Sequence, residues 1–248
     1  MVKRKEKLTI KNGKLEVLLI MEIEIRNHPK FNNVFVSGSP ENLRLFTKNL
    51  RPGTSVYGEK LYIFRGIEYR EWDPYRSKLA ALLLKNPLQN FFTRDFSCLY
   101  LGAASGTTIS HLSDINPDGV IYGVEFAPRS IRQLVQNTSE RNNIISILGD
   151  ANRPESYAKA IFNKVDLMYQ DVAQPNQTEI AIKNCDYYLK KGGIVILAIK
   201  SQSIDSMASL EKIYNQEKQI LKDANLEILE SVNIQKFAQK HIIIILRK

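Results

Sequence analysis

The chain has 248 residues, of which 44% are hydrophobic, enough to fill the core of one α/β domain and a small further module. Its 35 Lys and Arg outnumber 26 Asp and Glu, and the resulting formal charge of +9 favours a polyanionic partner or an anionic surface. No apolar run reaches the ~18 residues of a membrane-spanning helix, so we expect no membrane-embedded segment.

The first 20 residues carry a large share of the positive charge. Six Lys or Arg against two Glu give them a net charge of +4, which leaves +5 for the rest of the chain. The apolar stretch at 15–21 is short, contains Glu16 and is followed by no small-residue cleavage site, which argues against a secretory signal. We therefore expect residues 1–20 to form a basic, flexible extension.

A small β-rich module is predicted for residues 21–72. Residues 33–36 and 61–64 are rich in β-branched and aromatic side chains, and the dipeptides at 52–53 and 58–59 mark turns. Because no helical pattern of useful length intervenes, we expect the strands of this module to pair antiparallel.

From residue 73 to residue 248 the pattern is that of an α/β domain. Asp73-Pro74 opens a predicted helix that runs to about residue 85 and carries Lys78 in an early turn. Apolar strands then alternate with helical segments, which predicts a mostly parallel sheet with right-handed crossovers. The expected strands are 97–101, 119–125, 144–148, 165–170, 194–199, 226–232 and 241–246, and the expected helices are 107–114, 128–139, 154–161, 176–189 and 207–223.

The last two strands are joined by too few residues for a crossover helix, so we expect them to be antiparallel neighbours. The prediction is therefore a Rossmann-like α/β fold whose seven-stranded sheet is mostly parallel and ends in an antiparallel strand. Cys98 and Cys185 lie in no metal-binding or redox spacing, and both fall in or beside apolar segments. We expect them to be buried reduced thiols in a cytoplasmic protein, and we expect no metal site.

The loop after the first parallel strand is the most informative stretch. Residues 99–108 read Leu-Tyr-Leu-Gly-Ala-Ala-Ser-Gly-Thr-Thr, and acidic residues end the next apolar runs at Glu125, Asp150 and Asp171. Nucleoside-containing ligands bind at the carboxyl ends of such strands, where glycine admits the ligand and a carboxylate accepts hydrogen bonds from ribose hydroxyls. An ordinary strand-to-helix turn would explain the loop alone, but it would not explain the three acids.

The spacing of the glycines favours one ligand over another. A dinucleotide fingerprint G-x-G-x-x-G uses its middle glycine to admit a pyrophosphate, and this loop lacks that glycine. S-adenosylmethionine (SAM) has the ribose and the adenine but no phosphate. We therefore expect SAM as cofactor rather than a nicotinamide dinucleotide.

Four further side chains are expected at the same edge of the sheet. Asp171 and Lys200 follow the carboxyl ends of parallel strands, and His241 begins an antiparallel strand at that edge. Lys78 starts near the same edge, in the helix that leads into the first strand. The topology thus predicts one crevice that holds all four. Taken singly, each also fits a plainer role, such as a surface lysine, a helix cap at Asp171 or a structural histidine.

Long segments of the chain resemble one known family. The segments are NLRPGTSVYGE, EYREWDPYRSKLAA, LGAASGTTISHLSDI, GVIYGVEFAPRS, DANRPESY, VDLMYQDVAQPNQ and ILAIKSQSID. Together they are similar to fibrillarin in its archaeal form, from about Met21 to the C-terminus. The resemblance implies a SAM-dependent 2′-O-methyltransferase that acts on rRNA or tRNA within box C/D ribonucleoproteins.

The resemblance also implies partners and site residues. The partners are a guide RNA with its target RNA, a Nop-type scaffold protein and a kink-turn-binding ribosomal-type protein, in the cytoplasm of an archaeal cell. The implied catalytic group is Lys78, Asp171, Lys200 and His241. The implied cofactor contacts are Gly102, Ala103, Thr107, Thr108, Glu125, Phe126, Asp150, Ala151, Asp171, Val172, Ala173 and Gln174. The acidic residues that usually precede the family's last histidine are absent before His241.

Two other functions remain open from the sequence alone. One is a SAM methyltransferase that modifies a protein side chain, and the other is a structural subunit of an RNA–protein particle without catalysis. Both lysines and Asp171 are present, which argues against the second. No stretch resembles a module that reads RNA sequence, so we expect target choice to rest on base pairing with a guide RNA.

Overall fold

The computed structural model describes the backbone of residues 3–11, 14–92 and 95–248, and the side chains of residues 23–92 and 95–248. Strands β1 (Lys3–Lys11) and β2 (Lys14–Glu22) pair antiparallel with each other. Our expectation for residues 1–20 falls partly on positions 1, 2, 12 and 13, which lie outside the described residues. The flexibility of this segment, and the division of the chain at residues 20 and 72, stay predictions.

The stretch expected to be β-rich forms a five-stranded antiparallel sheet. Its strands, in spatial order, are β3 (Arg26–Asn27), β4 (Val34–Ser37), β5 (Arg44–Lys48), β7 (Ile67–Trp72) and β6 (Leu61–Phe64). One short 3₁₀ turn, η1 (Pro40–Asn42), lies between β4 and β5. Leu45 and Phe46 on β5 join different apolar clusters, because successive side chains of a strand face opposite sides of the sheet.

The second unit is a seven-stranded sheet, as predicted. In spatial order its strands are β10 (Ile144–Leu148), β9 (Val120–Glu125), β8 (Ser97–Leu101), β11 (Val165–Gln170), β12 (Leu189–Lys200), β14 (His241–Arg247) and β13 (Glu227–Asn233). The five strands from β10 to β12 run parallel, whereas β14 is antiparallel to both of its neighbours. The chain order of the strands reverses at β8, since β9 and β10 follow on one side of it and β11 and β12 on the other. Such folds bind ligands in the crevice at the carboxyl ends of the strands where the order reverses.

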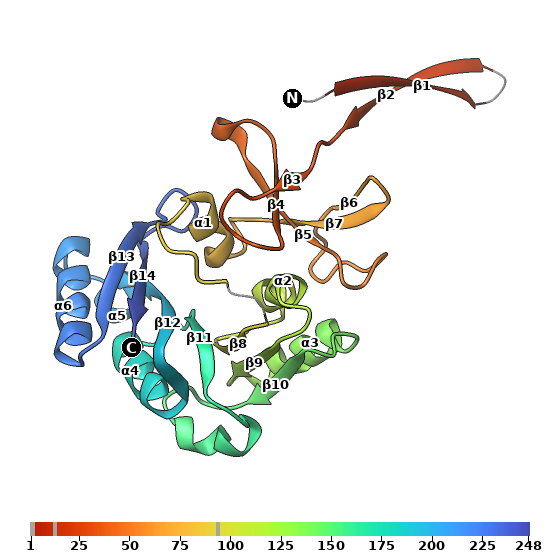
Figure 1. Ribbon diagram of the computed structural model, residues 1–248. Helices are drawn as coiled ribbons and strands as arrows, with labels where there is room; N and C mark the ends of the chain where they lie inside the picture. The colour runs from red at the N-terminus through yellow and green to blue at the C-terminus, as the bar shows by residue number, and fades with distance from the viewer. Residues whose placement is uncertain (1–2, 12–13, 93–94) are drawn as a thin grey trace.

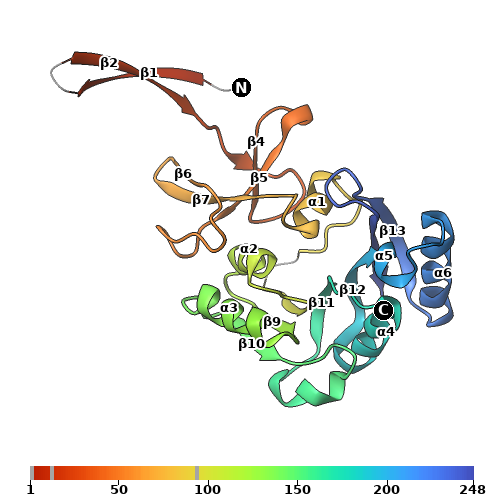
Figure 2. The ribbon, with the colours of Figure 1, turned by 180° about the vertical axis from the view of Figure 1, so that it is seen from behind.

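Apolar side chains of this sheet alternate between two cores. On β8, Cys98 and Tyr100 join one buried cluster while Leu99 and Leu101 join the other. The first core is closed by the N-terminal sheet and by α1 (Lys78–Leu84), α2 (Thr107–Ile115) and α3 (Pro128–Thr138), and the second by α4 (Gln177–Tyr188) and α6 (Leu210–Asp223). Figures 1 and 2 show these two groups on opposite faces of the sheet.

Two of the predicted helices are wrong in detail. The helix expected from Asp73 begins only at Lys78, because Asp73 closes a turn by accepting the backbone N–H of Tyr75 at 2.8 Å. The segment expected as a helix at 154–161 is the 3₁₀ turn η2 (Pro154–Ala160). There Tyr157 leaves helical geometry and donates its hydroxyl to Asn184 on α4.

Other boundaries differ less. Strand β12 begins at Leu189, five residues before the predicted start, and a short helix α5 (Ser201–Ile204) precedes α6. The N-terminal part of β12 contains Gly192 and Gly193, which weaken a strand pattern in the sequence. Within the described part of the chain, none of the helices has the length and apolar character needed to span a bilayer.

A buried ion network joins the two sheets. The carboxylate of Asp114 on α2 accepts from Arg70 of β7 at 2.8 Å and from Arg141, which follows α3, at 2.6 Å. Thr47 of β5 donates its hydroxyl to the same carboxylate at 2.8 Å. Arg70 is fully buried and also pairs with Glu59 at 2.6 Å. The N-terminal sheet is therefore tied to α2 by charges with no access to solvent.

His111, one turn before Asp114 on α2, completes this interface. Its ring stacks on Trp72 with centroids 4.8 Å apart, and its nitrogens lie 2.8 Å from the hydroxyls of Thr47 and Tyr57. Burial lowers the pKa of His111 well below its usual value, and the neighbouring arginines lower it further. Thr47 gives its proton to Asp114, and its oxygen can accept a hydrogen bond from Nδ1 of the imidazole.

Replacing Asp114 with alanine will leave Arg70 and Arg141 buried without their carboxylate. We expect the free energy of unfolding to fall by about 3–5 kcal/mol, which is typical when one partner of a buried ion pair is removed. The measurement is urea denaturation followed by circular dichroism. Glu227→Ala is the matched control, since the Glu227–Arg247 pair is exposed and should cost at most about 1 kcal/mol. Equal losses in the two variants would contradict the role of the network.

Candidate active site

A cavity of about 370 Å³ lies at the carboxyl ends of β8, β11 and β12. All four side chains predicted to converge, Lys78, Asp171, Lys200 and His241, line its wall. The topological prediction of one crevice is therefore confirmed as geometry, although 163 positions separate the first residue from the last. The lining also includes Arg76, Tyr100, Gly102, Ala103, Ala104, Thr107, Thr108, Val172 and Ala173.

Two of the lining side chains, Lys78 and Asp171, form an ion pair. Lys78 Nζ lies 2.8 Å from both carboxylate oxygens of Asp171, and about a quarter of each side chain is exposed. Lys78 is the first residue of α1, and the N-cap Ser77 accepts the backbone N–H of Ala80. Thr108 of α2 donates its hydroxyl to Ser77 Oγ at 3.0 Å. The loop-to-helix turn after β8 thus holds the start of the helix that carries Lys78.

Lys200 and His241 face each other across neighbouring strands. They are register partners at the end of β12 and the start of β14. Gln177, fully buried at the start of α4, accepts the backbone N–H of Lys200 at 2.8 Å and donates to its carbonyl at 3.1 Å. Gln177 therefore fixes the backbone where the strand ends. Our sequence analysis missed this role, although Gln177 closes the quoted segment VDLMYQDVAQPNQ.

The imidazole of His241 is neutral here, and its single N–H hydrogen can be assigned to one nitrogen. Nδ1 lies 2.6 Å from the carbonyl oxygen of Gln239, so Nδ1 carries the hydrogen and Nε2 keeps its lone pair. Burial lowers the pKa of His241, the Gln239 carbonyl raises it, and the Lys78 and Lys200 charges lower it again. The site therefore places an unprotonated ring nitrogen beside two ammonium groups and one carboxylate.

A tight backbone approach brings the two strand ends together. Gly102 has a φ of +86°, and a Cβ placed there would come within 2.3 Å of the carbonyl oxygen of Asp171. The backbone N–H of Asp171 donates to Leu101 at 3.0 Å, which ties β11 to β8 at this point. Only glycine meets both conditions. Glycine at position 102 is therefore required by the close packing of β8 against the end of β11.

Glu125 organises the loop from the neighbouring strand. Its two carboxylate oxygens accept the backbone N–H groups of Ala104 and Ala127, each at 2.9 Å. Ala104 has a φ of +50°, a left-handed conformation that a residue other than glycine adopts only when it is held there. The Glu125 side chain is buried, yet each oxygen retains a lone pair for a further donor.

The remaining predicted cofactor residues lie outside the lining of the 370 Å³ cavity, at or after the carboxyl ends of β9 and β10 and in the loop that follows β11. They are Glu125, Phe126, Asp150, Ala151 and Gln174. Asn152 connects two of them, because its backbone N–H donates to Asp150 at 2.9 Å and its side-chain amide donates to Gln174 at 2.8 Å. Phe126 is 63% exposed, an unusual state for so large an apolar ring. Asn152 was missed by the sequence analysis.

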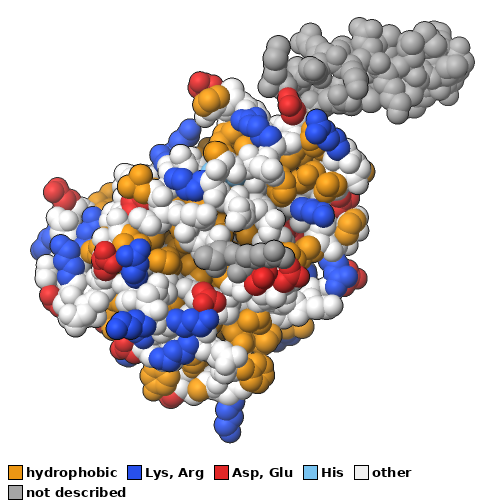
Figure 3. Space-filling view, viewed as in Figure 1, with side chains coloured by type: hydrophobic (Ala, Val, Ile, Leu, Met, Phe, Trp, Pro, Cys, Tyr) orange, Lys and Arg blue, Asp and Glu red, His pale blue; other side chains and the backbone are white. Residues whose placement is uncertain are grey.

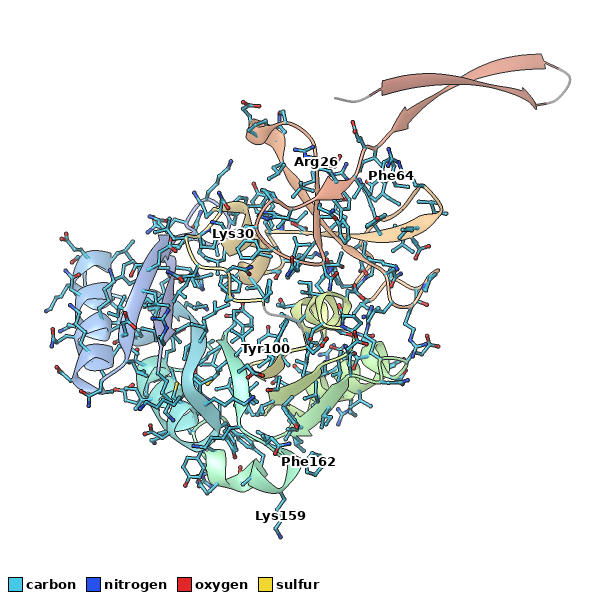
Figure 4. All side chains as sticks on the ribbon, viewed as in Figure 1. Arg26, Lys30, Phe64, Tyr100, Lys159 and Phe162 are labelled. Atoms are coloured by element: carbon cyan, nitrogen blue, oxygen red, sulfur yellow. The ribbon has the colours of Figure 1, made fainter. Side chains whose placement is uncertain are left out.

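Tyr100 lines the cavity from within the sheet (Figure 4). It is buried, and its ring packs on Tyr169 with centroids 4.7 Å apart. Burial and the negative charge of Asp171 raise the pKa of both tyrosines well above the usual value, so both keep their protons. In the described segments no group of three or more His, Cys, Asp or Glu is arranged to hold a metal ion.

Similarity to known proteins covers both sheets. The sequence profile of the fibrillarin family matches residues 25–248. The fibrillarin-like rRNA/tRNA 2′-O-methyltransferase of Aeropyrum pernix is 44% identical over 228 residues, or 91% of this chain and 97% of that protein.

Solved structures give the same result. The structure of Aeropyrum pernix fibrillarin with natively bound S-adenosyl-L-methionine matches with a TM-score of 0.83 at 44% identity, covering 91% of this chain and 99% of that one. The structure of a fibrillarin/Nop5p complex matches with a TM-score of 0.77 at 41% identity, covering 88% and 98%. These likenesses include the strands and loops that build the cavity.

The chain has three histidines, so the ring of His241 can be followed by NMR through a pH titration. We expect a pKa below 6.5, because burial favours the neutral form. Lys78→Met removes a positive charge and should raise this pKa, whereas Asp171→Asn removes a negative charge and should lower it. Shifts of the same sign in the two variants would contradict the arrangement, and Lys159→Met, at an exposed position, serves as control.

Proposed function

The chain belongs to the fibrillarin family, and we propose that it transfers a methyl group from SAM to ribose 2′-hydroxyls of rRNA or tRNA. One observation carries the proposal: the Lys78–Asp171 pair, Lys200 and His241 share one cavity beside the loop that follows β8. The relatives support it, since the Aeropyrum pernix relative carries the name of this activity and a solved structure of fibrillarin from that organism contains bound SAM.

The carboxyl ends of β8, β9 and β10 suit SAM. Gly102 and Ala103 would let the cofactor approach the backbone, and Glu125 would accept hydrogen bonds from its ribose hydroxyls. Phe126 offers an exposed ring for the adenine, and Asp150 with Ala151 lies at the end of the next strand. Thr107, Thr108 and Asp171 to Gln174 complete the proposed contacts. Bound SAM supplies a methyl group already activated by its positively charged sulfur.

The residues of the cavity would make a ribose 2′-hydroxyl a better nucleophile. A ribose 2′-hydroxyl is a very weak acid, so negative charge must be stabilised on its oxygen as the proton leaves. Lys78 and Lys200 place two ammonium groups at the cavity wall, and Asp171 fixes the first of them through both oxygens. His241 adds no third positive charge, and its Nε2 can accept a proton. Positioning supplies much of the remaining acceleration.

The proposal includes partners, because we expect the surface by itself to bind RNA weakly. Lys and Arg side chains on the face in Figure 3 lie in small groups among acidic and apolar ones. We propose assembly with a Nop-type scaffold, a kink-turn-binding ribosomal-type protein and a box C/D guide RNA, in the cytoplasm of an archaeal cell. The solved fibrillarin/Nop5p complex supports the first of these partners.

Glu125→Ala tests cofactor binding. Because a hydrogen bond to a charged group contributes ~1.5–3 kcal/mol, loss of the carboxylate should weaken SAM affinity by about one to two decades. Isothermal titration calorimetry measures the affinity, and thermal unfolding verifies that the variant is folded. Glu140→Ala, which removes an exposed glutamate, should leave the affinity unchanged. Unchanged affinity in a folded Glu125 variant would remove this residue from the proposed site.

Asp171→Ala and Lys200→Ala should each reduce methyl transfer by about 10²–10⁴-fold while the fold persists. His241→Ala should reduce it less, since water can accept the proton while both lysines remain, and since the acidic residues before this histidine are absent. Single-turnover assays in assembled particles measure the rates, with Lys159→Ala as control. If His241→Ala proved the most severe variant, the proposed ranking would be wrong.

Target selection is tested by moving the guide. The isolated protein should give negligible site-specific methylation, because its contacts to RNA are mainly to phosphates and carry no sequence information. The particle assembled with guide RNA and both partner proteins should methylate one paired nucleotide. Shifting the pairing register by one nucleotide should shift the modified position by one, as mapped by primer extension. Equal methylation by the protein alone would overturn the proposal.

A further inference from the structure

A second, larger cleft adjoins the catalytic cavity. It has a volume of about 700 Å³ and lies between β5 and β7 of the N-terminal sheet, the turn that precedes α1, and the connection from β13 to β14. In both Figure 1 and Figure 2 that connection lies beside α1. Arg76 lines both the cleft and the catalytic cavity, so the two spaces adjoin at this side chain.

Two of the aromatic rings that line the cleft pack together, one of them exposed and the other half-buried. Tyr75 is 67% exposed, and its ring packs edge-on against Phe237 with centroids 5.3 Å apart. Lys236 Nζ lies 5.6 Å from the Phe237 ring. Two segments that are 162 positions apart in the chain therefore build one platform of rings and a cation. Such a platform suits a ribose or a base face, which offers flat apolar surface beside a phosphate.

Arg76 is held in place before any ligand arrives. Its guanidinium lies 5.7 Å from the centroid of the Tyr57 ring and donates to the Tyr57 carbonyl at 3.2 Å. That contact uses one of five N–H groups, and the side chain remains exposed. A guanidinium fixed on one side and open on the other can bind a phosphate with two parallel hydrogen bonds.

The unpaired charges of the cleft sum to +1, which favours an anion over a basic peptide. Glu71 is paired with Arg44 at 2.7 Å and Glu59 with Arg70 at 2.6 Å, so these two acids are neutralised within the wall. Among the residues that the structure describes, the lining groups without an ion pair are Lys60, Arg76 and Lys236 on the positive side and Glu41 and Asp73 on the negative side. Asp73 also turns one oxygen toward the Tyr75 backbone N–H.

We propose that this cleft binds the sugar–phosphate backbone of the RNA strand next to the nucleotide that is methylated, a step that rests on the proposed function. Arg76 and Lys236 bind phosphates, and the Tyr75–Phe237 pair packs against the adjoining ribose. Arg76 and Lys78 are two positions apart, which limits the distance between their Cα atoms to about 7 Å. The neighbouring phosphate of a ribose in the catalytic cavity lies on that scale. These contacts position the strand without reading its sequence.

Steady-state kinetics in the assembled particle test the proposal. Lys236→Gln and Tyr75→Ala change residues that line only the larger cleft, and each should raise KM for target RNA by about tenfold. The plot of log(kcat/KM) against log[KCl] should flatten by about 0.7–0.9 in Lys236→Gln and in Arg76→Gln, one phosphate contact each. Tyr75→Phe should behave as wild type. SAM affinity, measured by calorimetry, should be unchanged in Lys236→Gln and in both Tyr75 variants, whose residues lie outside the lining of the catalytic cavity.

Matched controls lie on another side of the molecule. Lys159 extends into solvent near the exposed Phe162 ring, away from Tyr100 (Figure 4). Lys159→Gln and Phe162→Ala should therefore leave both KM and the salt slope unchanged. If Lys236→Gln and Tyr75→Ala also left them unchanged, the cleft would not hold RNA. Loss of scaffold-protein binding in pull-downs, with an unaltered salt slope, would assign the cleft to a protein and overturn the proposal.

Cross-linking separates this proposal from the proposed function. In a particle that carries Lys200→Ala, target RNA with 4-thiouridine beside the target nucleotide should cross-link to a peptide containing Tyr75 or Phe237, as identified by mass spectrometry. That result supports the cleft even when no methyl group is transferred. Cross-links confined to other peptides would contradict the cleft. Absence of methylation by the wild-type particle, with the cross-link present, would contradict the proposed function alone.

Discussion

The carboxylate of Asp114, buried between two arginines, is the interaction on which the arrangement of the active site depends. It holds β7 of the N-terminal sheet against α2 through Arg70, and it holds the segment after α3 through Arg141. Strand β7 is followed within a few residues by α1, and α2 follows the loop after β8 that belongs to the proposed cofactor site. The network therefore sets where Lys78 lies relative to Asp171, although none of its members touches the cavity.

Close backbone packing brings the charged side chains Lys78, Asp171 and Lys200 together in the 370 Å³ cavity. Gly102 lets the end of β8 pass the Asp171 carbonyl at a distance no side chain would allow, and Thr108 reaches Ser77 at the start of α1. Two lysines and a carboxylate then share one partly exposed space with a neutral histidine. Such a group would be costly in a dry interior, but here water or substrate can solvate it. The site is thus prepared for a substrate that brings its own negative charge.

The two adjoining spaces suggest a division of labour for an RNA methyltransferase. In the proposed function, the first space holds the groups that would act on a ribose oxygen, and the second offers the rings and cations that would bind the adjoining strand. Arg76 connects them and is braced on Tyr57, a residue whose hydroxyl also meets His111 in the buried interface. A change in the packing of the N-terminal sheet against α2 would therefore alter the position of Arg76 in the larger cleft as well as that of Lys78.

The sequence by itself determined the seven strands of the larger sheet, their mostly parallel direction and the edge at which Lys78, Asp171, Lys200 and His241 meet. Those features follow from apolar periodicity and from the rule that successive parallel strands end on one edge, both of which are local patterns. Only the tertiary structure decided that α1 begins at Lys78, that Gln177 holds the backbone of Lys200 and that Asn152 connects Asp150 to Gln174. Single polar side chains produce no periodic pattern in the sequence. Their hydrogen-bond partners are often distant in the sequence and then become neighbours only when the chain folds. The same reason hid the contact of Arg70 with Asp114, which spans 44 positions and yet anchors one sheet on the other.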